Sequence, residues 1–179
     1  MTTGTESMLD LRRYIRDVPD FPKPGILFKD ITPLLADAQA FRASIDGLRD
    51  AISGVPCDAI VGIESRGFMF GAALALSMQK GFVPVRKPGK LPVKVVRQEY
   101  SLEYGSDAIE MHHDAIKPGQ RVVIVDDLVA TGGTAEATCA LVESVGAQVS
   151  ALAFVVALDF IPWRERLGSR DVKALIRYS

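Results

Sequence analysis

The segment that decides the fold is Val122-Val123-Ile124-Val125-Asp126-Asp127-Leu128-Val129-Ala130-Thr131-Gly132-Gly133-Thr134. It begins with a continuous run of β-branched residues, which is typical of a parallel strand buried on both faces. Two adjacent carboxylates follow the run, then small residues, and then a helical pattern. Because neighbouring carboxylates repel each other, a pair at a strand end indicates a ligand. Ribose hydroxyls and a magnesium ion both suit such a pair.

The small residues after the two acids favour an anion site. They allow several backbone N–H groups to converge on one ligand, and the N-terminus of the following helix adds partial positive charge. We therefore expect a sugar phosphate to bind here. Its hydroxyls would lie on Asp126 and Asp127, and its phosphate would lie on the loop made of Ala130, Thr131, Gly132, Gly133 and Thr134. The alternative is a solvated acidic turn before a helix, which would not require the Thr-Gly-Gly-Thr sequence.

Strand and helix patterns alternate along the chain. The spacing of apolar residues predicts strands at 58–63, 82–85, 108–113, 121–125, 149–156 and 172–176, and helices at 41–52, 67–80, 135–145 and 162–167. A helix capped by Ser7 is expected to run to about Asp17, followed by irregular chain through the prolines and an extended piece at 26–28. This alternation predicts an α/β fold with a mostly parallel central sheet flanked by helices, whose ligands bind at the carboxyl ends of the strands.

Length and composition exclude several classes of protein. A chain of 179 residues, 48% hydrophobic and 24% charged, is typical of one globular domain. A net charge of −1 provides no basic field for nucleic acid, and no apolar run is long enough for a membrane span. The first residues lack the apolar segment of a secretory signal, and two cysteines make no disulfide framework. We therefore expect a cytoplasmic protein without nucleic-acid or membrane partners.

The segment at 122–134 resembles the phosphoribosyl-diphosphate motif of the type I phosphoribosyltransferases. Four further segments narrow the resemblance to the members that act on adenine: Phe21-Pro-Lys-Pro-Gly-Ile-Leu-Phe-Lys-Asp-Ile-Thr-Pro33, Gly62-Ile-Glu-Ser-Arg-Gly-Phe68, Val85-Arg-Lys-Pro-Gly-Lys-Leu-Pro92 and Ser101-Leu-Glu-Tyr-Gly105. The resemblance implies transfer of a 5-phosphoribosyl group from 5-phosphoribosyl 1-diphosphate to adenine, giving AMP and pyrophosphate. It also implies bound Mg²⁺, which Asp126 and Asp127 would contact through substrate or water, and a homodimer. The expected architecture is one domain over residues 1–179, with an N-terminal hood at 1–35 and a flexible lid hairpin at 86–107.

A second turn between a predicted strand and helix carries Glu64, Ser65, Arg66 and Gly67. It is similar to a nucleophile elbow, but Ile63 stands where that motif requires glycine, so a catalytic serine is disfavoured. A plain helix start with a surface arginine is the other alternative. The resemblance implies a pyrophosphate-binding loop that can hold a non-proline cis peptide. Arg66 would act in catalysis there, and Lys87 would add charge for the leaving diphosphate.

Two further groups depend mainly on the resemblance. Phe28, between Leu27 and Lys29, could fill the core or stack on a flat base. The resemblance implies that all three residues bind adenine, largely through backbone groups. It also implies that Glu103 transfers a proton at the purine and that Tyr104 closes over the reacting centre. On residue chemistry alone, a Glu-Tyr pair in a polar loop indicates little.

Two other functions remain as alternatives. One is a phosphoribosyltransferase for a 6-oxopurine, against which the Phe21–Phe28 segment argues. The other is a non-enzymatic regulator that senses purines or phosphoribosyl diphosphate. Such a protein would usually carry a nucleic-acid-binding extension, and the short N-terminal segment argues against one.

Overall fold

The computed structural model describes residues 9–101 and 106–179. The chain divides into two compact units, Met1–Asp46 and Gly47–Ser179, which are described one at a time.

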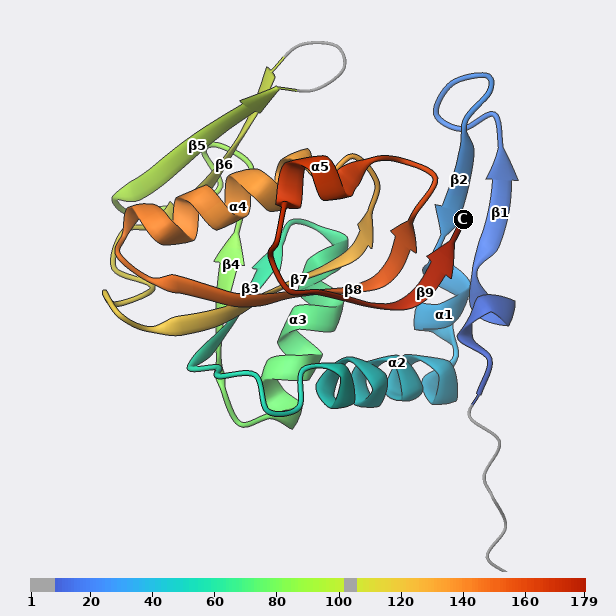
Figure 1. Cartoon of the computed structure of the whole chain (residues 1–179), viewed down its shortest axis with the longest axis horizontal. Helices are drawn as coiled ribbons and strands as arrows, with labels where there is room; N and C mark the ends of the chain where they lie inside the picture. The colour runs from blue at the N-terminus through green and yellow to red at the C-terminus, as the bar shows by residue number, and fades with distance from the viewer. Residues whose placement is uncertain (1–8, 102–105) are drawn as a thin grey trace, which may run out of the picture. The chain divides into compact units, whose positions relative to one another are not determined.

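The first unit contains a small antiparallel sheet. A 3₁₀ helix, η1 (Leu11–Tyr14), precedes β1 (Arg16–Pro19), which pairs with β2 (Leu27–Asp30); α1 (Thr32–Ala36) and the start of α2 (Ala38–Ala51) follow (Figure 1). The predicted helix to Asp17 is therefore wrong beyond η1. Asp17 lies in β1 and pairs with Lys29, at 2.6 Å between Oδ1 and Nζ, so cross-strand contacts override the helical pattern. The proposed cap Ser7 lies outside the described residues.

The second unit is built on a five-stranded sheet in the order β4-β3-β7-β8-β9, and every neighbouring pair is parallel. Its strands are β3 (Ala59–Ile63), β4 (Gly81–Val85), β7 (Arg121–Val129), β8 (Gln148–Leu158) and β9 (Val172–Tyr178). The predicted mostly parallel α/β sheet is confirmed. From β3 the chain continues to β4 on one side, whereas from β7 it continues to β8 and β9 on the other. The strand order therefore reverses between β3 and β7, where open α/β sheets bind ligands.

Helices cover both faces of this sheet. In Figure 1, α3 (Arg66–Ser77) lies on one face, and α4 (Gly133–Ser144) lies on the other face together with the hairpin of β5 (Val95–Ser101) and β6 (Ser106–His112). Helix α4 packs against β5, and the short α5 (Trp163–Leu167) packs against α4. The predicted lid at 86–107 thus includes β5 and the first residues of β6, while residues 102–105 lie outside the described residues.

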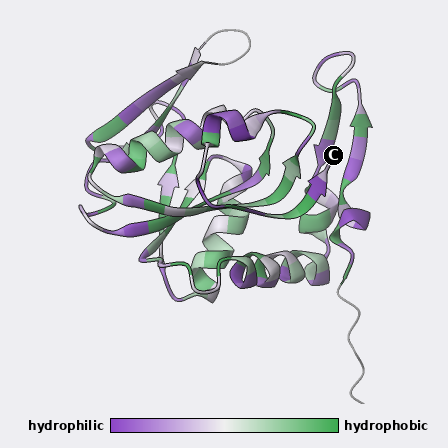
Figure 2. Cartoon of the chain, viewed as in Figure 1, coloured by the Kyte–Doolittle hydropathy of each residue, from purple (hydrophilic) through white to green (hydrophobic). Residues whose placement is uncertain are grey.

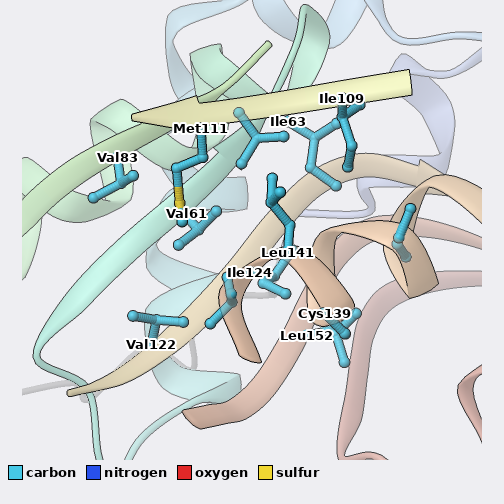
Figure 3. Packing of buried hydrophobic residues seen from close by; sticks show 14 of the residues in the cluster. Val61, Ile63, Val83, Ile109, Met111, Val122, Ile124, Cys139, Leu141 and Leu152 are labelled. Atoms are coloured by element: carbon cyan, nitrogen blue, oxygen red, sulfur yellow. The ribbon is translucent and has the colours of Figure 1, made fainter. Parts of the chain in front are cut away.

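The main core lies between the sheet and the layer of α4 and the hairpin. Figure 3 shows Val61, Ile124 and Leu152 from three strands meeting Leu141 of α4 and Met111 of β6, and all five are at most 1% exposed. Figure 2 shows hydrophobic colour along β8, whose last eight residues are all buried. Such continuous apolar strands are expected where both faces of a parallel sheet are covered. Within the described part of the chain, no helix has the length and apolar character to cross a membrane.

One strand boundary and one helix differ from the predictions, and the boundary matters for function. Strand β7 continues to Val129 rather than ending at Val125, so both acids lie within the strand instead of after it. Pairing with β8 continues through this stretch and holds it extended. Helix α1 was not predicted, although Pro33 in its first turn is a known signal for a helix start.

A close approach of helix to sheet depends on Gly67 in the first turn of α3. A Cβ atom at Gly67 would lie 2.7 Å from Oδ1 of Asp126 and 2.8 Å from the backbone oxygen of Val125. Because one of these atoms belongs to the backbone of a central strand, the conflict cannot be relieved by a side-chain rotation alone. Glycine therefore allows α3 to begin directly against the acidic end of β7.

We predict that Gly67→Ala lowers the free energy of unfolding by about 1–3 kcal/mol, the usual cost of overpacking. The matched control is Gly81→Ala, where a Cβ atom meets nothing within 4 Å. That control should leave stability unchanged or raise it slightly, because alanine reduces the conformational entropy of the unfolded chain. Urea unfolding of both variants measures the difference, and equal stabilities would show that the helix can move away from β7 without cost.

Candidate active site

The site begins where β7 extends beyond the end of its pairing with the neighbouring strand β3. Pairing between β3 and β7 ends at Gly62 and Val125, whereas pairing between β7 and β8 continues to Val129 and Ala157. The last four residues of β7 thus have β8 on one side, and among the described residues no strand pairs with them on the other. This leaves an open edge at the point where the strand order reverses.

A pocket of about 470 Å³ occupies this edge. Its lining comes from the ends of β3 and β7, from the middle of β8, from the first turns of α3 and α4, and from the chain after β4: Ile63, Glu64, Ser65, Arg66, Lys87, Asp126, Asp127, Leu128, Val129, Ala130, Thr131, Gly132, Gly133, Thr134, Ala135 and Phe154. The structure therefore brings together the acidic pair, the loop 130–134, the turn 64–66 and Lys87. Gly67 lies directly behind this lining, in contact distance of Asp126.

The two acids differ in exposure and in partners. Asp126 is partly exposed and accepts a hydrogen bond at its Oδ1 from the backbone N–H of Asp127, at 2.9 Å. Asp127 is buried, and its Oδ2 lies 2.9 Å from Nε of Arg66. The direction of that N–H makes the contact an ion pair without a hydrogen bond, so Oδ2 retains unused accepting capacity.

The protein around both carboxyls, the half-buried Asp126 as well as the buried Asp127, withdraws them from water and raises their pKa. For Asp126 the negative charge of Asp127 raises the pKa further, well above its ordinary value. For Asp127 the positive charge of Arg66 opposes the effect of burial, so its pKa is raised less strongly. A cation or a set of hydroxyl donors at this edge would relieve the repulsion between the acids and favour their ionised forms.

The loop after β7 ends at a helix N-terminus. Gly132 precedes α4 with φ of 81°, in the left-handed region that favours glycine, and has no side chain to cap the helix. A Cβ atom there would also approach the backbone oxygen of Trp163 to 3.1 Å. The first backbone N–H groups of this 12-residue helix thus border the pocket, as an anion site requires.

The turn between β3 and α3 contains a cis peptide between Glu64 and Ser65. The Glu64 carboxylate accepts hydrogen bonds from the backbone N–H of Lys87, at 2.9 Å, and from Nε of Arg86, at 3.1 Å. Burial raises the pKa of Glu64, but these hydrogen bonds together lower it below its ordinary value. The side chain of Glu64 therefore fixes the chain after β4. The sequence, which predicted only an anion-binding loop at this turn, could not indicate this role.

Three cations, Arg86, Lys87 and Lys90, follow β4, and of these three Lys87 lines the pocket. Arg86 instead pairs with Glu64 and lies over the ring of Phe68, 6.0 Å from its centroid. Lys90 is exposed, and its backbone oxygen accepts a hydrogen bond from Arg86.

Some predicted site residues do not line the pocket, and one residue that lines it was not predicted. Leu27, Phe28 and Lys29 form β2 in the first unit, and Glu103 and Tyr104 lie outside the described residues. Phe154 of β8 lines the pocket and was missed, because within a continuous apolar strand no sequence signal separates it from its core neighbours.

The donor set fits a divalent cation that is shared with a substrate. Among residues 9–101 and 106–179, no cluster of three His, Cys, Asp or Glu side chains could hold a metal alone. Mg²⁺ is usually bound by one or two carboxylates together with substrate oxygens. Asp126 and Asp127, with the unused accepting capacity of Oδ2, meet that requirement.

Comparison with known proteins agrees with this geometry. Residues 34–161 match the phosphoribosyl transferase domain family. The adenine phosphoribosyltransferase of Thermotoga neapolitana is 55% identical over 95% of this chain and 100% of the relative, and that of Acidobacterium capsulatum is 57% identical over 94% and 93%. The crystal structure of adenine phosphoribosyltransferase from Thermoanaerobacter pseudethanolicus has a TM-score of 0.92 at 53% identity, covering 94% of this chain and 98% of the other.

The yeast enzyme, from Saccharomyces cerevisiae, was crystallised with an imino-altritol bisphosphate and adenine. It has a TM-score of 0.87 at 44% identity, over 92% of this chain and 96% of that one. A pocket built from an acidic strand end, two helix N-termini and two cations is thus found on a chain that matches these enzymes along nearly its whole length. The chain belongs to the adenine phosphoribosyltransferases of the type I phosphoribosyltransferase family.

Proposed function

We propose that this pocket binds 5-phosphoribosyl 1-diphosphate and that the chain transfers its 5-phosphoribosyl group to adenine, giving AMP and pyrophosphate. The observation that carries the proposal is the meeting of two acids, two helix N-termini and two cations in one pocket at the open edge of β7. This combination provides acceptors for ribose hydroxyls and separate donors for two phosphate-bearing ends of one substrate.

Each part of the substrate is assigned to its own set of binding residues. The 5-phosphate binds the backbone N–H groups and hydroxyls of the loop 130–134. Asp126 and Asp127 accept hydrogen bonds from the ribose hydroxyls. The diphosphate binds the turn at Ser65, Arg66 and Gly67 together with Lys87, while Glu64 acts through the chain that it holds.

The reaction breaks the bond between ribose C1 and a diphosphate oxygen and forms a bond from C1 to adenine N9. Positive charge develops on the ribose ring and negative charge on the departing pyrophosphate. Arg66 and Lys87 stabilise the negative charge from fixed positions, so little reorganisation is needed. Mg²⁺, which the acidic pair would contact through the substrate or water, would supply further charge stabilisation when bound.

Adenine and the proton of its N9 involve residues beyond this pocket. We assign adenine binding to Leu27, Phe28 and Lys29, with Phe28 stacked on the base. Glu103 receives or holds the proton, and Tyr104 closes over the reacting centre. These assignments rest on the family resemblance of the segments that carry them.

The proposal also covers assembly and location. Residues 1–179 act as one functional domain, and two copies form a homodimer, with Arg86 and Lys87 near the place where partners meet in the family. Sedimentation velocity measures the assembly directly, and a single species at the monomer mass would contradict it. Cys57 and Cys139 are buried free thiols, in agreement with a reducing cytoplasm.

We predict that adenine is the only base converted efficiently in a panel of adenine, hypoxanthine, guanine and xanthine, with phosphoribosyl diphosphate and magnesium present. A site that hydrogen-bonds the adenine edge rejects a 6-oxopurine by about 10⁴-fold or more, because the wrong pattern leaves buried groups unpaired. Comparable rates with hypoxanthine would favour a 6-oxopurine enzyme, and no turnover with any base would favour a purine sensor.

We predict that the double variant Asp126→Asn and Asp127→Asn loses activity by about a hundredfold or more, since each hydrogen bond to a charged group contributes ~1.5–3 kcal/mol. Stability should change in the opposite direction. A buried carboxyl with a raised pKa destabilises the folded state at any pH above its unfolded pKa, so two neutral amides should leave the melting temperature unchanged or raise it. Near-normal turnover in the folded variant would contradict the sugar-binding role.

We predict that Arg66→Ala weakens inorganic pyrophosphate binding by roughly 10- to 100-fold, because a charge-assisted contact is lost. Adenine binding should change less than twofold, since Arg66 is assigned to the other substrate. Isothermal titration calorimetry of both ligands separates the two effects. Arg42→Ala is the matched control, because its side chain is 85% exposed and its i,i+4 pair with Asp46 contributes little. An unchanged pyrophosphate affinity in Arg66→Ala would remove Arg66 from the diphosphate site.

A further inference from the structure

We infer that Tyr100 and Asp107 are positioning residues that hold the Lys87 ammonium at the edge of the pocket for the leaving diphosphate. The inference rests on the proposed diphosphate-binding role of Lys87. It assigns a function to two residues of the β5–β6 hairpin, an element none of whose described residues lines the pocket.

The three side chains form a closed triangle of contacts. Nζ of Lys87 donates to Oη of Tyr100 at 3.0 Å and forms an ion pair with Oδ2 of Asp107. Oη of Tyr100 in turn donates to the same Oδ2, at 3.2 Å. An ammonium has three hydrogens, and these contacts within the described residues use two of them. The third is available for an oxygen of a ligand in the pocket.

The triangle is anchored in the core. Tyr100 is 9% exposed and belongs to the main hydrophobic cluster, and it lies directly opposite Asp107 in the register of β5 and β6. At the other end of the lysine, Glu64 accepts the backbone N–H of Lys87. The backbone of Lys87 and the ammonium at the end of its long, flexible side chain are therefore both fixed before any ligand binds.

The arrangement also separates the carboxylate from the ligand site. Lys87 lines the pocket, whereas Tyr100 and Asp107 do not. The hairpin thus holds the ammonium from behind, on the side away from the pocket, rather than occupying the place of the diphosphate. A carboxylate that competed with the diphosphate for Lys87 would be expected among the lining residues.

The same contacts preserve the charge of the lysine. Burial lowers the pKa of Lys87, but the hydrogen bonds with Asp107 and Tyr100 raise it by more, so its pKa lies above the ordinary value. The ammonium is therefore charged at neutral pH, and it loses less conformational freedom on binding than a solvated lysine would.

The net charge near the pocket and the positioning role predict opposite effects of removing Asp107 on the affinity for an anion. Removing the Asp107 carboxylate makes the surroundings of the pocket more positive, which by itself would tighten binding of an anion. If Asp107 acts by positioning Lys87, its removal must weaken binding. The sign of the change therefore distinguishes the two.

The experiment measures the affinity of magnesium pyrophosphate by isothermal titration calorimetry of the full chain. We expect Asp107→Asn to weaken binding roughly three- to tenfold, as expected for loss of one partly exposed charge-assisted contact. Tyr100→Phe keeps the packed ring and should weaken binding about two- to threefold. Asp107→Glu should recover part of the loss. The control is Glu99→Gln, which removes a carboxylate that is 71% exposed on the same hairpin and should have no effect.

A double-mutant cycle tests whether Asp107 acts through Lys87. In a Lys87→Ala background, Asp107→Asn should change the affinity less than twofold, because the group that it positions is absent. An equal loss in both backgrounds would show a structural role in the hairpin and overturn the inference. Tighter or unchanged binding by Asp107→Asn and Tyr100→Phe in the wild-type background would also overturn it. If Lys87→Ala itself leaves the affinity unchanged, the proposed role of Lys87 fails, which is a distinct result.

Discussion

The rest of the site depends on one constraint: the last four residues of β7 extend beyond its pairing with β3. Pairing with β8 keeps Asp126–Val129 extended, while the absence of a β3 neighbour leaves one edge of these residues open. The first turns of α3 and α4 begin on either side of this edge. Because Gly67 lacks a Cβ atom, α3 can start in direct contact with the acids, so donors and acceptors meet within one small pocket.

This geometry places charges where folding alone would not favour them. Removal from water raises the pKa of both acids, the charge of Asp127 raises the pKa of Asp126 further, and Arg66 only partly offsets the rise for Asp127. The surrounding core, which contains the continuous apolar runs of β7 and β8, offsets the free-energy cost of these buried charges. Conflicts between stability and local chemistry are expected at functional sites, because a ligand completes the interactions there.

Long-range contacts give several residues a role that their neighbours in sequence do not suggest. Glu64 resembles a member of an anion loop, yet its carboxylate holds Lys87 and Arg86. Asp107 is the second residue of β6, yet it reaches Lys87, 20 residues away in sequence. In both cases an acid fixes Lys87, Glu64 at its backbone N–H and Asp107 at its ammonium. The pocket thus acquires its shape from ion pairs between elements as well as from the strand ends themselves.

The sequence by itself determined the parallel α/β sheet, the order of its elements and the acidic phosphate-binding segment, because periodicity and small-residue spacing are local signals. It did not determine that β7 runs on to Val129, that the chain before Pro19 forms a strand, or that Phe154 lines the pocket. These depend on which strands lie side by side and where their pairing stops. The resemblance named Lys87 for the diphosphate, but only the tertiary structure showed why the adjacent Arg86 does not share this place, because folding pairs Arg86 with Glu64 and leaves Lys87 at the lining of the pocket.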